Sequence, residues 1–202
     1  MEKNSSRETV LLIFGVIILV VAVIGVSFAA FSYSKTGEKL NAITTGTITM
    51  SYSETTNGIN LTNALPMSDA VGKALNSQNQ YFDFTVTASI TGTTTINYLI
   101  SCTKESGSTL VDTAVKVYLT DMTSSKDTQI VAPTKISALT KTASSEISGA
   151  PSGQYKLTSG TISSSTTKKY RLRMWVADDY SSLSTSGTYK LRVNVYGKAA
   201  AQ

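Results

Sequence analysis

The ten residues YFDFTVTASI, Tyr81–Ile90, carry the clearest structural signal in the chain. Every second residue of this stretch is apolar: Phe82, Phe84, Val86, Ala88 and Ile90. The residues between them are Tyr81, Asp83, Thr85, Thr87 and Ser89. A strict period of two over ten residues predicts a strand with one buried and one solvated face, which is typical of antiparallel sheets.

Similar alternation recurs along the rest of the chain. It predicts further strands at 47–53, 94–103, 114–120, 128–132, 154–162, 167–177 and 188–197. Loops rich in Ser, Thr and Gly separate these segments, and no long helix is expected after residue 31. The expected fold class is therefore all-β: an antiparallel β-sandwich, jelly-roll or immunoglobulin-like, preceded by one N-terminal hydrophobic helix.

Two connections between these strands can be interpreted in more detail. Asn57 and Gly58 favour a two-residue hairpin turn, which predicts that 47–53 is followed by a return strand starting at Ile59 and Leu61. The stretch 63–80 has no periodicity and predicts a long connection over a sheet, with at most a turn or two of helix at 69–75.

The apolar segment 10–31 contains no charged residue and follows a polar head that carries Lys3 and Arg7. It is long enough to cross a bilayer as a helix. Small residues at Ser27 and Ala29 also predict cleavage by a signal peptidase between Ala29 and Ala30. Residues 1–29 are thus a signal peptide or a membrane anchor, 30–46 an N-terminal extension with a donor strand and linker, and 47–202 the β-sandwich domain. The membrane is contacted only through 10–31, if this segment is retained.

The composition narrows the classes of function. The chain contains 28 Ser and 30 Thr and has a net charge of +5. This moderate basicity suits an anionic wall polymer, although solubility alone also explains it. No nucleic-acid partner is expected.

Catalytic and metal-binding motifs are missing from the sequence. The absence of histidine removes Ser-His-Asp and Cys-His catalysis and every histidine-containing zinc site. The single cysteine, Cys102, lies on the apolar side of a predicted strand and is expected to be buried. We expect no enzyme activity, no cofactor and no metal.

Two surfaces are candidates for contact with a partner. Phe31 and Tyr33 alternate with Ser32 and Ser34 directly after the cleavage site, as a short strand that could pair with its own sheet or with a neighbouring molecule. Arg171, Arg173 and Trp175 occupy the outer face of predicted strand 167–177. They would form a basic, aromatic surface for a wall polymer, polysaccharide or partner subunit, or else an ordinary solvated face.

Three motifs carry a resemblance to a known family. These motifs lie in the junction Ser27-Phe28-Ala29-Ala30-Phe31-Ser32, in the strand Ile43-Thr44-Thr45-Gly46-Thr47-Ile48-Thr49-Met50, and in a third region. The third region consists of Asn60-Leu61, Pro66-Met67-Ser68-Asp69 and the strand Phe82-Asp83-Phe84-Thr85-Val86. They resemble the TasA/camelysin group of exported Gram-positive proteins, whose signals are cut by a SipW-type signal peptidase. The resemblance covers about residues 27–90.

The resemblance implies a jelly-roll-like subunit of extracellular fibres. In that family the mature N-terminus is thought to pair as a donor strand with the next subunit. Carried over by position, 30–34 would be the donor, with Phe31 and Tyr33 filling the acceptor groove. Some members have been called metallopeptidases, but this chain has no histidine and no HExxH motif to support that activity.

The sequence therefore predicts an exported surface protein of a Gram-positive bacterium, extracellular or, if 10–31 is retained, membrane-anchored. The leading hypothesis is a structural subunit of a fibre or biofilm matrix that self-assembles, or assembles with related subunits, by donor-strand pairing. The alternative is a membrane-tethered β-sandwich that binds a cell-wall polymer or host ligand through Arg171, Arg173 and Trp175.

Overall fold

The computed structural model describes residues 32–36, 41–45, 48–54, 59–62, 64–77, 80–92, 94–147, 149–181 and 187–200. The apolar segment 10–31, the cleavage site at Ala29 and Ala30, and the boundary expected at 46–47 lie outside these residues. Within the described part of the chain, no helix has the length and apolar character needed to cross a membrane.

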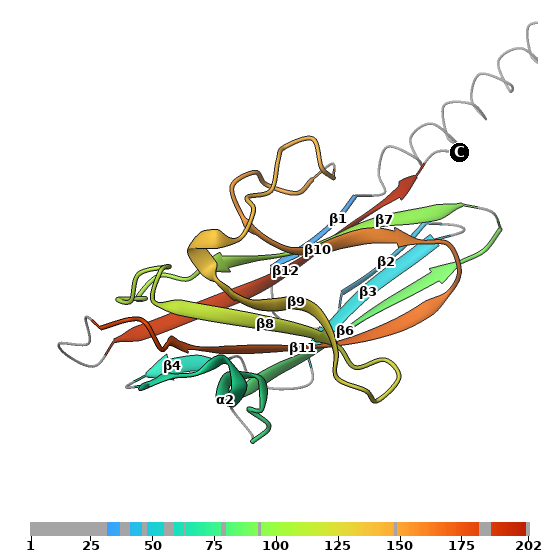
Figure 1. Ribbon diagram of the computed structural model, residues 1–202. Coiled ribbons are helices and arrows are strands. Elements are labelled where there is room, and N and C mark those ends of the chain that lie inside the picture. Colours follow the sequence, from blue (N-terminus) through green and yellow to red (C-terminus); the bar gives the residue numbers. More distant parts are fainter. Residues whose placement is uncertain are drawn as a thin grey trace, which may run out of the picture.

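The described residues form two β-sheets (Figure 1). The five-stranded sheet contains β1 Ser32–Thr36, β4 Asn60–Thr62, β7 Thr95–Lys104, β10 Tyr155–Ile162 and β12 Thr188–Ala200. The seven-stranded sheet contains β2 Asn41–Thr45, β3 Ile48–Glu54, β5 Pro66–Met67, β6 Tyr81–Ile90, β8 Val115–Asp121, β9 Thr128–Lys135 and β11 Thr166–Ala177. The short helices α2 Asp69–Lys73 and η1 Ile136–Ala138 complete the described elements. The all-β, antiparallel prediction is confirmed.

The strands pair in a nested order. β8 pairs with β9, β7 with β10, β6 with β11 and β4 with β12, and all four pairs are antiparallel. These pairs alternate between the two sheets. The chain thus runs as one long folded-over hairpin whose successive strand pairs lie on opposite sides of a common core.

The core is formed by the alternating apolar residues of both sheets. Phe82, Phe84, Val86 and Ala88 of β6 are all buried, and the ring of Phe84 stacks on Tyr170 of β11 at 5.2 Å between centroids. The predicted burial of Cys102 is also confirmed, and burial raises the pKa of its thiol well above the usual range. A protonated, enclosed thiol is unreactive.

Two local expectations change in the structure. β3 and β4 do not form the expected hairpin around Asn57 and Gly58, because β3 already pairs with β2 on one edge and β6 on the other. β4 instead pairs with β12 in the opposite sheet. The expected extension 30–46 contributes β1 and β2, one to each sheet.

The long connection expected at 63–80 covers part of a sheet. β5 pairs in parallel with the end of β11, Pro66 opposite Val176 and Met67 opposite Ala177. Helix α2 follows directly and packs on the same strand. This short segment buries a sheet face that the alternation alone predicts to be solvated.

Candidate assembly edge and its pocket

β1 lies along one edge of β12 as an antiparallel strand. Its register places Ser32 opposite Lys198 and Thr36 opposite Asn194. Tyr33, one of the two predicted donor residues, lies opposite Gly197 in this ladder. Phe31, the other, is outside the described residues, as are Ala29 and Ala30. The structure therefore places residues 32–36, which closely follow the expected cleavage site, on the edge of their own sheet.

The same edge of β12 also carries β4, farther toward the start of that strand. Lys190 lies opposite Asn60, and Thr188 opposite Thr62. Between Lys190 and Asn194, no described strand pairs with β12 on this side, although β7 pairs with its other side throughout. We call residues 191–193 the edge gap.

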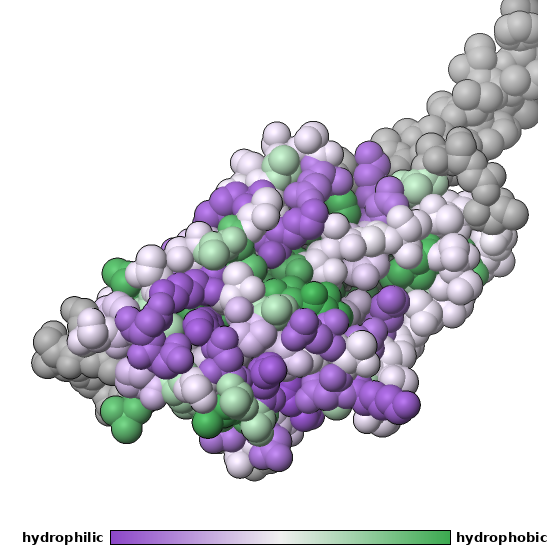
Figure 2. Space-filling model, viewed as in Figure 1, coloured by the Kyte–Doolittle hydropathy of each residue, from purple (hydrophilic) through white to green (hydrophobic). Residues whose placement is uncertain are grey.

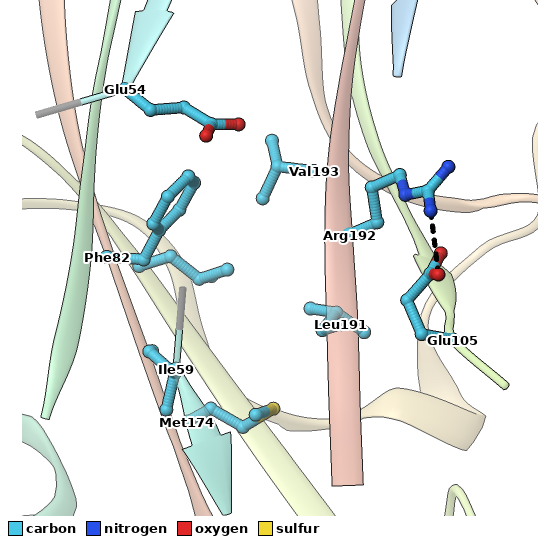
Figure 3. Close-up of a pocket in the computed structure, with 9 residues that line it drawn as sticks. Glu54, Ile59, Phe82, Glu105, Met174, Leu191, Arg192 and Val193 are labelled. Atoms are coloured by element: carbon cyan, nitrogen blue, oxygen red, sulfur yellow. Dashed lines mark hydrogen bonds and ion pairs between the residues drawn. The ribbon is translucent and has the colours of Figure 1, made fainter. Parts of the chain in front are cut away.

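A pocket of about 200 Å³ opens between the two sheets beside the edge gap (Figure 3). β12 contributes the three gap residues, and β7 is followed at the rim by Glu105. The opposite sheet contributes Glu54 of β3, Phe82 of β6, and Leu172 and Met174 of β11, while Ile59 precedes β4. Six of the nine lining residues are apolar, and the other three contribute two carboxylates and one guanidinium.

Two of the three charged side chains of the pocket lining, Arg192 and Glu105, pair with each other. Arg192 points away from the pocket and binds Glu105 through Nη2 and Oε2 at 2.8 Å (Figure 3). The carboxylate of Glu54 points across the pocket toward Val193. It accepts a hydrogen bond of 2.9 Å from the Tyr52 hydroxyl, and no cation of the described residues pairs with it. Within the described part of the chain, the pocket thus combines apolar side chains with one carboxylate, that of Glu54, which has no cationic partner.

The prediction of an exposed basic, aromatic surface on β11 is wrong. Trp175 is 0% exposed and Arg173 is 2% exposed. Arg171 remains half-buried at the surface, but both carboxylate oxygens of Asp83 bind it at 2.7 Å, and Tyr81 lies under its guanidinium. None of the three offers a free group to an anionic polymer.

Segment 64–77 and a neighbouring loop explain this burial. Arg173 donates from Nε to the carbonyl of Leu75 at 2.6 Å and pairs with Asp127 through its two Nη groups. Burial raises the pKa of the Asp127 carboxyl, but hydrogen bonds from Arg173 and Thr120 outweigh it and hold the pKa below its usual value. Alternation shows that a strand has two faces; it does not show that a distant, aperiodic segment covers the second one.

A cluster around Asp112 fastens the loop after β7. Asp112 accepts hydrogen bonds from the Tyr155 hydroxyl and, at 2.9 Å, from the Tyr189 hydroxyl, and Lys104 lies 3.4 Å away. Burial raises the pKa of the Asp112 carboxyl, but these donors hold it below its usual value. Burial and Asp112 together raise the pKa of Tyr155 to about 12. The partners of Asp112 are thus two neutral hydroxyl groups and one lysine. We interpret the cluster as structural, because it links the loop to three strands.

The opposite edges of the two sheets are less suited to strand addition. β9 contains Pro133, and its pairing with β8 is broken by two register shifts. β10 has one register shift against β7. Figure 2 shows a mostly purple and white surface with a green band in the region of β9 and β10 of Figure 1. Among the residues of β9, Ile130 and Val131 are partly buried and pack against the core. Bulges and proline are common means of blocking edge pairing.

The sequence gives no signal for the edge gap or for the role of Glu54 and Arg192, because both depend on which strands share an edge. No family model and no curated protein matches this chain. The interpretation of the site therefore depends on its geometry.

Proposed function

We propose that the chain is an exported structural protein, a subunit of an extracellular fibre or biofilm matrix at the surface of a Gram-positive bacterium. In this proposal a signal peptidase cuts between Ala29 and Ala30. Residues 30–36 then leave their own β12 and pair with β12 of a second copy. The observation that carries the proposal is the position of β1, an edge strand at the start of the expected mature chain that pairs, among the described strands, with β12 alone.

Moving β1 from its own β12 to the β12 of a second copy would keep the same backbone pairing. Its backbone ladder to residues 194–198 can form equally with its own β12 or with that of a copy, so the exchange costs little beyond chain ordering. Only residues 37–40 join β1 to β2 in the other sheet. When each subunit donates its strand to the next, one end of the assembly keeps a vacant β12 edge and the other end keeps a free strand, so the contact repeats head to tail and builds an open polymer. Phe31 and Tyr33 are the residues that we expect to fill the groove of the next subunit.

The fold that we infer for the domain is a jelly roll. Its support is the nested pairing, because the orders β4-β12-β7-β10 and β6-β11-β8-β9 are those of an eight-stranded hairpin wrapped over two sheets. β2 and β3 extend the second sheet beyond β6. If 10–31 is retained, the same domain is held at the membrane. A polymer-binding module on the outer face of β11 is not favoured, because Arg173 and Trp175 are covered.

The proposal is tested with purified protein 30–202 beside 37–202, which lacks β1. We expect filaments by electron microscopy and a sedimenting fraction for 30–202 only. Thermal unfolding of 37–202, with and without a synthetic peptide of residues 30–36, controls for misfolding: the peptide should raise the melting temperature. A monomeric 30–202 at high concentration would refute self-assembly.

A further inference from the structure

The edge gap lies on the continuation of the β1 ladder. Within β1, each step forward along the strand moves one residue back along β12, from Lys198 opposite Ser32 to Asn194 opposite Thr36. Continued in the same register, residues 37, 38 and 39 fall opposite Val193, Arg192 and Leu191. These are the three residues that no described strand covers, and β4 occupies the edge immediately beyond them.

Residues 37–39 cannot pair with β12 of their own chain in this register. Asn41 pairs with Tyr52 on β3, in the sheet opposite to β12. A strand that reached residue 39 on its own β12 would have two residues to cross to Asn41, a reach of about 7 Å. Packed sheets lie roughly 10 Å apart. A strand supplied by a second copy is free of this constraint, because its β2 belongs to another molecule.

The side chains required by this register fit the pocket. Residues directly opposite each other in a sheet lie on the same face. Leu191 and Val193 line the pocket, so Lys39 of the incoming strand would enter it and Gly37 would leave it unobstructed. The aliphatic stem of a lysine suits the apolar side chains of the pocket, and its ammonium suits the Glu54 carboxylate, which no cation of the described residues pairs with. Glu38 would stand beside Arg192 on the outer face, as an opposite-charge pair.

We propose that the edge gap and its pocket form the second half of the acceptor site, which takes residues 37–39 of a second copy and pairs its Lys39 with Glu54. This inference rests on the proposed strand exchange and lengthens it from five paired residues to eight. It also fixes the register of the incoming strand on β12, because β4 blocks any pairing beyond residue 191.

The test uses two charge-reversed variants of protein 30–202, Lys39→Glu and Glu54→Lys, alone and in an equimolar mixture. Alone, each variant sets like charges against each other at every contact. We expect the critical concentration for sedimentation to rise about tenfold. In the mixture, each variant complements the other in both orders, so assembly should return to within about twofold of the unmodified protein.

The matched control is Lys169→Glu, which reverses an exposed lysine on β11, outside β12 and the pocket lining. It should assemble like the unmodified protein, alone and mixed. Monomer unfolding curves check that each variant folds, and Glu54→Gln removes the charge where Glu54→Lys does not fold; its critical concentration should then rise by a few-fold.

The outcomes separate this inference from strand exchange itself. If the unmodified protein assembles and Lys39→Glu and Glu54→Lys do so equally well, or their mixture assembles no better than either variant alone, the pocket is not part of the contact and strand exchange through β1 survives. If the unmodified protein 30–202 stays monomeric, the exchange fails and this inference with it.

Discussion

Gly72 of helix α2 lies against the indole of Trp175, so closely that a Cβ at position 72 would come within 2.3 Å of ring atoms Cδ2 and Cε2. Trp175 belongs to β11, more than a hundred residues farther along the chain, and is fully buried. This contact holds segment 64–77 on the outer face of the sheet.

Gly72→Ala should therefore loosen that segment. The added methyl group cannot be accommodated without moving the indole or the helix, and overpacking of this kind costs about 1–3 kcal/mol. Trp175 is the only tryptophan, so its fluorescence reports the site directly, with a red-shifted emission as water enters. Lys73→Ala, an exposed neighbour on the same helix, should change stability by less than about 0.5 kcal/mol. An unshifted spectrum and unchanged stability for Gly72→Ala would show that the close contact is not present in solution.

The pair of Arg173 and Asp127 should matter more than pairs at the surface. The Arg173 side chain is 3% exposed, so Asp127→Ala leaves a buried guanidinium without its counter-ion. Because Asp127 is itself 39% exposed and water can reach the site, we expect a loss of about 1–3 kcal/mol in urea unfolding. Asp179→Ala removes the exposed partner of Lys135 and should leave the unfolding midpoint unchanged. Equal effects for the two substitutions would contradict the burial of Arg173.

Acid should weaken the fold through Asp112. Its pKa in the folded chain lies below the ordinary value of 3.8, so the carboxylate stabilises the fold fully above that value. The contribution is lost as the pH falls through the folded pKa. Asp112→Asn should therefore lower stability at pH 6 and flatten its decline between pH 4 and pH 2, measured by urea midpoints. A variant that follows the unmodified protein throughout would remove Asp112 from the acid response.

Tyr33→Ser should impair the proposed assembly and leave the two-sheet fold intact. If Tyr33 fills the groove of the next subunit, loss of its ring removes about 1.5–3 kcal/mol of burial per contact, which is tenfold or more in critical concentration. Ser34→Ala is the matched control in the neighbouring position of β1. Sedimentation at graded concentrations gives both values, and equal assembly of the two variants would exclude Tyr33 from the contact.

Most strands of the core could be predicted from the sequence, because period-two alternation depends only on one buried face, whereas β2 and β5 lie in stretches that were expected to be a linker and a connection. β6 was predicted with its observed bounds, and β11 differs by one residue at its start. Strand partners could not be predicted in this way. Asn57-Gly58 is a sound local turn signal, but β2 and β6 already occupy both edges of β3, so β4 joins the other sheet.

The candidate site was predicted only in part. A short strand with Phe31 and Tyr33 after the expected cleavage site was predicted, and its pairing with its own sheet was one of the alternatives; the structure describes this strand as Ser32–Thr36. Trp175 was predicted to lie on the outer face of its strand, and it does. The prediction that it is exposed is wrong, because Gly72 of α2 covers its ring. The pocket beside Glu54 could not be predicted, because it lies at the gap that β1 and β4 leave on the same edge of β12. The alternation of residues within a strand does not show which strands share an edge.

The most direct test of strand exchange is a disulfide between Ser32→Cys and Lys198→Cys in one chain. These positions are opposite each other in the β1–β12 ladder, at a separation that a disulfide can span, while the native Cys102 is buried. After mild oxidation of assembled protein, exchange between copies predicts a ladder of covalent multimers on a non-reducing gel. Monomer oxidised before assembly should run as a single band. A single monomer band from assembled protein as well would show that β1 stays on its own β12, and would contradict the account.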